Sequence, residues 1–173
     1  DGVYRWQPLL LGVEVKNHRE WIYPMTAAVW VMIRKCLELD ALPLLVSRKI
    51  AYITHSVFAR LGIMGFEFYR QIFAPEVGHH LTDIQHTDRL GYKDVIALPP
   101  EPYPPLVAFL QTTLPARMEE NRETWMASRE LLTEFAIRRK LGDPEMTERE
   151  RQTHYNEFAR QLFYGEPEVE EWY

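Results

Sequence analysis

The first hundred residues show two patterns of hydrophobic residues, one typical of extended strands and one typical of helices. Residues 1–6 and 8–16 have the character of two strands, and the turn-prone Gln7-Pro8 between them suits a hairpin. The run 9–15 is almost continuously apolar, a pattern typical of a strand that is covered on both faces. The beginning of the chain therefore predicts strands and a buried sheet.

The second pattern is helical. Residues 24–39 are apolar on nearly every side, and Pro24 suits the first turn of a helix, where its missing N–H costs nothing. Residues 50–61 carry apolar side chains every three or four positions, and Gly62 is placed as their C-terminal cap. Further strands are expected at residues 44–46, 65–73 and 94–98.

The last third of the chain is helical in pattern. A proline cluster within residues 99–105 separates a predicted α/β core, residues 1–98, from a helical extension, residues 106–173. Thr147 and Glu150 form a capping-box signature for the last helix, which should reach about Tyr164. The predicted fold is a central mixed sheet flanked by helices, followed by this extension.

Composition agrees with one domain that buries an ordinary core. The 173 residues are 46% hydrophobic and 13% aromatic, which is enough for a core without disulfides. The net charge of −5 is uneven, because residues 1–100 carry +1 and residues 101–173 carry −6. The first part can therefore hold a local basic cleft, whereas a wholly basic coat for nucleic acid is excluded.

The single cysteine, Cys36, lies in an apolar run and favours a reducing, cytoplasmic compartment. We expect a buried structural thiol rather than a nucleophile. The longest largely apolar stretch, residues 23–33, is too short for the ~20 residues that span a bilayer, so no membrane contact is expected. Because the chain begins at Asp1 without a methionine, we expect it to be part of a longer polypeptide.

The triplet Glu14-Val15-Lys16 is chemically unusual for its place in an apolar strand. Residues i and i+2 of a strand face the same side, so Glu14 and Lys16 should point together and Val15 away from them. Glutamate and lysine are almost never fully buried unless they are paired. A strand-end ion pair on a solvated face is one interpretation, and a catalytic pair is the other.

The order of strand, strand with Glu14-Val15-Lys16, helix, strand, helix, strand resembles the core of the PD-(D/E)XK nuclease superfamily. This superfamily includes archaeal Holliday-junction resolvases and many restriction endonucleases, and the resemblance covers roughly residues 1–73. In that family an acidic residue begins one strand, and (D/E)-x-K lies on its hairpin neighbour. Asp1, thirteen residues before Glu14, falls at the right distance for the first acidic residue.

The resemblance implies a restriction-endonuclease-like core and metal-dependent cleavage of phosphodiester bonds, in DNA rather than RNA. Asp1 and Glu14 would hold Mg²⁺ or Mn²⁺, since such hard cations take one or two carboxylates and complete their shell with water and phosphate. Lys16 would orient the attacking water or stabilise negative charge. Asp1, Glu14 and Lys16 are thus the expected catalytic residues.

Other residues near this strand are weaker candidates. Glu20 could support or extend the metal site. Arg48 and Lys49 follow a predicted strand and could bind phosphate, although an exposed basic turn explains them equally well. A zinc site among His79, His80, Asp83 and His86 is conceivable, but a polar surface is the stronger expectation.

Two alternatives concern partners. The nuclease-like fold could survive without catalysis, as a module that binds nucleic acid or protein. The extension is either an ion-paired helical cover or a homodimer interface, which would use Trp125, Leu132, Phe135 and Ile137.

Overall fold

The computed structural model describes residues 10–165, and it has a mixed α/β architecture. Its first half follows the order β1-α1-β2-α2-β3. The elements are β1 (Leu11–Lys16), α1 (Ala27–Leu39), β2 (Leu42–Ser47), α2 (Tyr52–Leu61) and β3 (Met64–Glu67). The expected strand at residues 1–6 and its hairpin lie outside the described residues.

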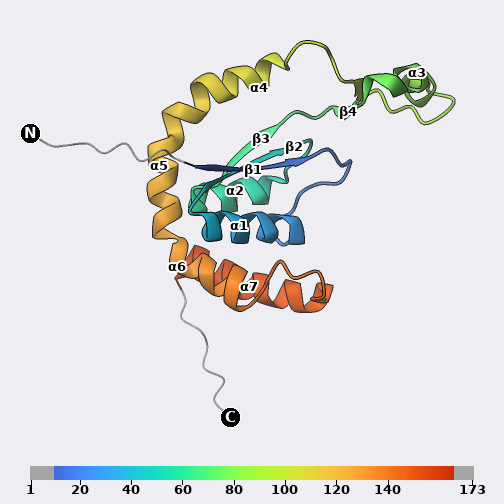
Figure 1. Ribbon diagram of the computed structural model, residues 1–173. Coiled ribbons are helices and arrows are strands. Elements are labelled where there is room, and N and C mark those ends of the chain that lie inside the picture. Colours follow the sequence, from blue (N-terminus) through green and yellow to red (C-terminus); the bar gives the residue numbers. More distant parts are fainter. Residues whose placement is uncertain (1–9, 166–173) are drawn as a thin grey trace, which may run out of the picture.

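The three strands form a parallel sheet in chain order, β1-β2-β3. A parallel sheet requires a crossover between consecutive strands, and right-handed crossovers in one direction place both helices on the same face. Figure 1 shows α1 and α2 on one side of the sheet, with α7 (Glu148–Tyr164) beyond α1. A mixed sheet was expected, but every described pairing of these strands is parallel. The antiparallel partner was predicted at residues 1–6.

The central strand β2 is buried at each of its residues, whereas β1 is open on one face. Val13 and Val15 are 53% and 63% exposed. The expectation that the run 9–15 is covered on both faces is therefore wrong. Phe66 lies in the same row as Val15 and is covered by the rings of Tyr103 and Phe109, but this cover stands over β3 and leaves the edge strand β1 open.

The first two helices lie where the sequence pattern predicts them and end at the predicted residues, but they begin three and two residues later than predicted, so Pro24 lies before α1 and not in its first turn. Helix α1 begins at Ala27, and Pro24 precedes it; the carbonyl of Pro24 accepts a hydrogen bond from Trp30 Nε1 at 2.8 Å. Helix α2 ends at Gly62, whose φ of 71° is the left-handed conformation expected of a cap. The absence of a side chain at Gly62 also allows the backbone of Asn121 to approach closely, since a Cβ on this glycine would lie 2.1 Å from the backbone oxygen of Asn121.

The predicted strand 65–73 is divided in two. β3 ends at Glu67, Tyr69 adopts a φ of 54°, and β4 (Gln71–Phe73) pairs with β5 (Val95–Ala97) in a second, two-stranded parallel sheet. The left-handed residue redirects the chain, and the alternation of side chains across residues 65–73 does not reveal such a turn. Between β4 and β5 lie a 3₁₀ turn (Pro75–Val77) and α3 (Gly78–Gln85).

We call residues 71–98 the rim lobe, because they lie beyond the carboxyl ends of the main strands. Figure 1 shows this lobe, with α3, set apart from the body of the molecule on the side toward which β1 points.

The predicted helical extension follows as a nearly continuous path. It consists of α4 (Pro104–Ala108), a π-helical turn (Phe109–Thr113), α5 (Leu114–Ala127), α6 (Arg129–Leu132) and a second π-helical segment (Thr133–Arg138). Helix α7 then begins with the predicted capping box, in which Thr147 and Glu150 each accept a hydrogen bond from the other's backbone N–H. None of the described helices combines the length and apolar character that a bilayer crossing requires.

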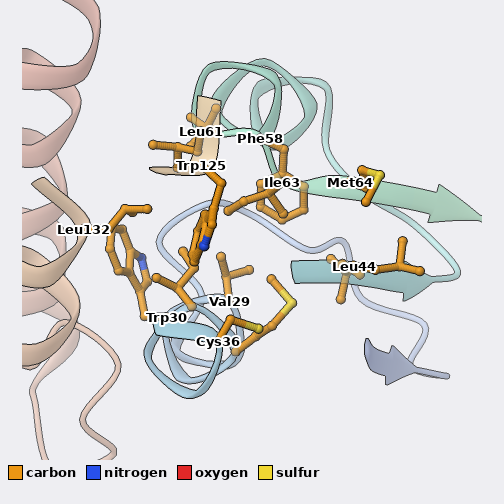
Figure 2. Packing of buried hydrophobic residues seen from close by; sticks show 14 of the residues in the cluster. Val29, Trp30, Cys36, Leu44, Phe58, Leu61, Ile63, Met64, Trp125 and Leu132 are labelled. Atoms are coloured by element: carbon orange, nitrogen blue, oxygen red, sulfur yellow. The ribbon is translucent and has the colours of Figure 1, made fainter. Parts of the chain in front are cut away.

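The extension shares the hydrophobic core of the sheet. Trp125, Leu132 and Phe135 are at most 2% exposed and belong to one cluster with the residues of α1 and β2. Figure 2 shows Leu132 beside Trp30 and Trp125 directed toward Val29. Three of the four residues considered for a dimer interface are thus buried inside the chain itself.

Candidate functional site

Glu14 and Lys16 lie together near the carboxyl end of β1. Lys16 Nζ is 2.6 Å from Glu14 Oε1, and both side chains are about one-quarter exposed. They face the same side as Gly12, over which α1 packs, whereas Val15 points to the open face. A carboxylate and an ammonium that are partly withdrawn from water attract each other more strongly than a fully exposed pair does.

The other expected ligand of the metal, Asp1, lies outside the described residues. Glu20 is exposed. Within residues 10–165 no group of three His, Cys, Asp or Glu side chains is arranged to hold a metal ion. Glu14 is a hard oxygen donor suited to Mg²⁺ or Mn²⁺, and such an ion needs only one or two carboxylates besides water and phosphate. Among the described residues, Glu14 is therefore the one expected ligand that could bind Mg²⁺, and it would supply part of such a site.

Cys36 underlies this strand from α1. Its Sγ donates to the carbonyl of Gly12 at 3.9 Å. Burial, followed by the nearby charge of Glu14, raises the pKa of the Cys36 thiol to about 11. The expected buried and inert thiol agrees with this position, because the nucleophilic form of cysteine is the thiolate.

The residues that follow Lys16 are bound to the rim lobe. Asn17 makes two hydrogen bonds with the backbone of Ile72 in β4, one of them from Ile72 N to Asn17 Oδ1 at 3.1 Å. Arg19 Nη2 pairs with Asp94 at 3.2 Å, and the Arg19 guanidinium lies 3.8 Å from the ring centre of Tyr92. The carboxyl end of β1 is therefore in contact with the second sheet.

Arg48 does not have the exposure that binding of phosphate requires. Its side chain is fully buried, donates to the carbonyl of Tyr69 from Nε and Nη2 at 2.9 and 2.8 Å, and pairs with Asp94. The predicted role of Arg48 in phosphate binding is therefore wrong, because a basic residue after a strand can also turn inward to bind carbonyl groups. Lys49 is partly exposed, and its Nζ lies 5.5 Å from the ring centre of Trp21, so it stays available as a cation near this rim.

Glu67 is a rim residue that the sequence pattern did not single out. Lys16, Ser47 and Glu67 occupy one row across the three strands, so Glu67 faces the same side as the Glu14–Lys16 pair. Its carboxylate accepts a hydrogen bond from Ile50 N at 2.6 Å and lies 3.4 Å from His55 Nε2. A glutamate that ends a short apolar strand is the signal that could have identified it.

A cavity of about 460 Å³ lies along the outer side of β3, between α2 and α5. Arg117 and Asn121 line one wall, and His55 and Phe58 line the other. Because β3 is two strands away from β1, this cavity is separate from the Glu14–Lys16 pair.

The histidine-rich segment of the rim lobe does not assemble a zinc site within the described residues. The rings of His79 and His80 are tilted relative to each other by 44° with their centres 3.8 Å apart, and His86 Nδ1 lies 3.7 Å from Asp88 Oδ2 on the surface. The polar-surface interpretation of this segment agrees with that arrangement.

Comparison of the chain with protein-family models, with curated proteins and with solved structures gives no match. The function is therefore argued from the residues of the site.

Proposed function

We propose that the chain is a metal-dependent nuclease that hydrolyses phosphodiester bonds in DNA, with Glu14 and Lys16 as its central pair. The observation that supports this proposal is the close approach of the Glu14 carboxylate and the Lys16 ammonium on one face of β1. The carboxyl ends of parallel strands are where ligands gather in α/β sheets. A partly buried acid and base at that rim suit a charged substrate such as a phosphodiester.

In this proposal Glu14, together with Asp1, holds Mg²⁺ or Mn²⁺. When bound, such an ion supplies a water of lowered pKa and neutralises charge on the scissile phosphate. The ammonium of Lys16, 2.6 Å from Glu14, would donate a hydrogen bond to the attacking water or to a phosphate oxygen. Lys49 beside Trp21 gives this rim a further cation for the DNA backbone.

The test is cleavage of labelled duplex and branched DNA with Mg²⁺ or Mn²⁺, against the same reaction with EDTA. Glu14→Gln removes the charge that binds the metal, and Lys16→Ala removes the ammonium; each should abolish cleavage while the circular dichroism spectrum stays unchanged. The matched controls are Glu119→Gln and Arg122→Ala, which break an exposed ion pair of 2.7 Å on α5 and should cut at the normal rate. Normal cleavage by either site variant would refute the assignment.

A second candidate function is a non-catalytic module that binds nucleic acid or a protein. It is favoured by the closed Glu14–Lys16 ion pair and by the inward-turned Arg48, neither of which needs a metal. The same experiment separates the two functions. The module predicts that DNA or a partner binds with equal affinity in the presence of EDTA, and that no metal gives cleavage.

A further inference from the structure

Three consecutive residues after Lys16 are each bound by groups beyond β1. Asn17 bonds the backbone of Ile72, the carbonyl of His18 accepts from Arg48 Nη1 at 3.4 Å, and Arg19 pairs with Asp94. Among residues 10–165, β1 is an edge strand of its sheet, and the end of such a strand would otherwise be free to fray. Here the chain leaving the Glu14–Lys16 pair is fixed residue by residue.

Arg48 joins the two sides of this arrangement. It follows β2, and its guanidinium donates to His18 on the β1 side and to Tyr69 and Asp94 on the side of the rim lobe. A fully buried cation is stable only when its donors are satisfied and its charge is compensated. The carboxylate of Asp94 supplies the compensating charge, and it also binds Arg19.

We propose that Arg48 and Asp94 are positioning residues that hold the carboxyl end of β1, and with it the Glu14–Lys16 pair, in its working place. The proposal rests on the proposed function for its catalytic consequence, but the fixing of β1 is a separate physical claim. A displacement of about 1 Å in a catalytic group can cost about 100-fold in rate, so a device that fixes the strand end matters even without touching substrate.

The position of these residues favours this role over simple packing. Lys49 is adjacent to Arg48 and equally cationic, yet it is directed to the surface beside Trp21. Arg48 instead places each of its nitrogens on a carbonyl or a carboxylate. The planar guanidinium suits several fixed acceptors, which a lysine ammonium would not match.

Asp94→Asn is the variant of choice, because it keeps the size of the side chain and removes the charge that compensates Arg48. Arg48→Lys is a second variant, although it carries a greater risk of unfolding. Hydrogen exchange of backbone amides is followed in the full chain without metal or DNA. Amides of residues 16–19 and of Ile72 should exchange about ten-fold faster in Asp94→Asn, whereas amides of α7 should be unchanged.

The kinetic arm compares cleavage at saturating DNA. Asp94→Asn should lower kcat by about ten-fold or more with KM unchanged within about two-fold, and Asp94→Glu should recover part of the loss. Glu119→Gln, which also removes a carboxylate from an arginine pair, should change neither measurement.

The outcomes are distinct. Unchanged exchange at residues 16–19 in Asp94→Asn overturns the positioning role, whatever the activity. Faster exchange with an unchanged kcat also overturns it, because the fixed strand end would then be irrelevant to the pair. If the wild-type chain cuts no DNA with any metal, the proposed function fails, and hydrogen exchange alone decides whether Arg48 and Asp94 hold β1.

Discussion

Gly12 packs against the sulfur of Cys36 so closely that a Cβ on Gly12 would lie 2.3 Å from it. The contact joins β1 to α1 two residues before Glu14. Its close approach requires the absence of a side chain at position 12, not a special backbone angle. The packing of α1 against the strand that carries the candidate site therefore depends on this glycine.

The substitution Gly12→Ala should destabilise the protein by about 1–3 kcal/mol, the usual cost of forcing extra volume into a packed interior. Urea denaturation at pH 7 measures the change. The double variant Gly12→Ala, Cys36→Ala gives the matched control, because removal of the sulfur makes room for the new methyl group. A cost that is equal with and without Cys36 would show that the two residues do not compete for space.

The raised pKa of Cys36 predicts a pH effect at the alkaline end. The folded chain keeps the thiol protonated up to about pH 11, whereas the unfolded chain ionises it near 9.0. The contribution of this thiol to stability is fully present below pH 9.0 and is lost as the pH rises toward 11. The difference in unfolding temperature between the wild type and Cys36→Ala should therefore change between pH 9 and 11 in favour of Cys36→Ala. A difference that stays constant over this interval would contradict the raised pKa of the thiol.

Asp94 predicts an effect at the acid end. Burial alone would raise its pKa, but a hydrogen bond from its own backbone N–H and the charges of Arg19 and Arg48 outweigh burial and lower the pKa below 3.8. The stability that this carboxylate contributes is present above pH 3.8 and is lost as the pH falls through the lower folded pKa. Asp94→Asn should thus unfold at a lower temperature than the wild type at pH 7, and the difference should shrink as the pH falls below 3.8. A difference that stays constant as the pH falls would contradict the assignment.

A chain that ends at Pro99 should fail to fold as a compact monomer. It would lose the cover that Trp125, Leu132, Phe135 and Phe158 give to α1 and the sheet. Each such side chain contributes about 1.5–3 kcal/mol by burial, and together they rival the whole stability of about 5–15 kcal/mol. Near-ultraviolet circular dichroism would detect the loss of packing, and a folded monomer of residues 1–99 would contradict the shared core.

Two point variants sharpen this test within the full chain. Phe135 is fully buried, so Phe135→Ala should cost about 3–5 kcal/mol, whereas Ile137 is 38% exposed and Ile137→Ala should cost far less. Both residues were candidates for a dimer interface. If light scattering shows a dimer that Ile137→Ala converts to a folded monomer, the interface alternative gains its first support.

The sequence pattern located most elements of the fold for a physical reason. Helices α2 and α7 were predictable because Gly62 and the Thr147–Glu150 box satisfy helix ends by local chemistry. The division of the strand 65–73 was not predictable, because the left-handed Tyr69 lies where its carbonyl accepts hydrogen bonds from Arg48, which is distant in the sequence. Local pattern cannot encode a partner that lies 21 residues away.

The same distinction applies to the site. The Glu14–Lys16 pair follows from the two-residue period of a strand, which is a local property. Glu67 joins their row only through the register of three strands. The acceptors that surround the inward-turned Arg48 come from His18, Tyr69 and Asp94, which are distant from it in the sequence. Residues whose neighbours are set by topology are therefore the ones that sequence reasoning missed or misassigned.

The strands β1, β2 and β3 are parallel and follow chain order, and the chain passes from β3 to α4 through the rim lobe. The rim lobe is therefore an internal segment that stands between two parts of the body. One contact ties it closely to the main sheet. A change in the lobe that removes the carboxylate of Asp94 would leave the buried guanidinium of Arg48 without an anion, and this would destabilise the main sheet as well as the lobe.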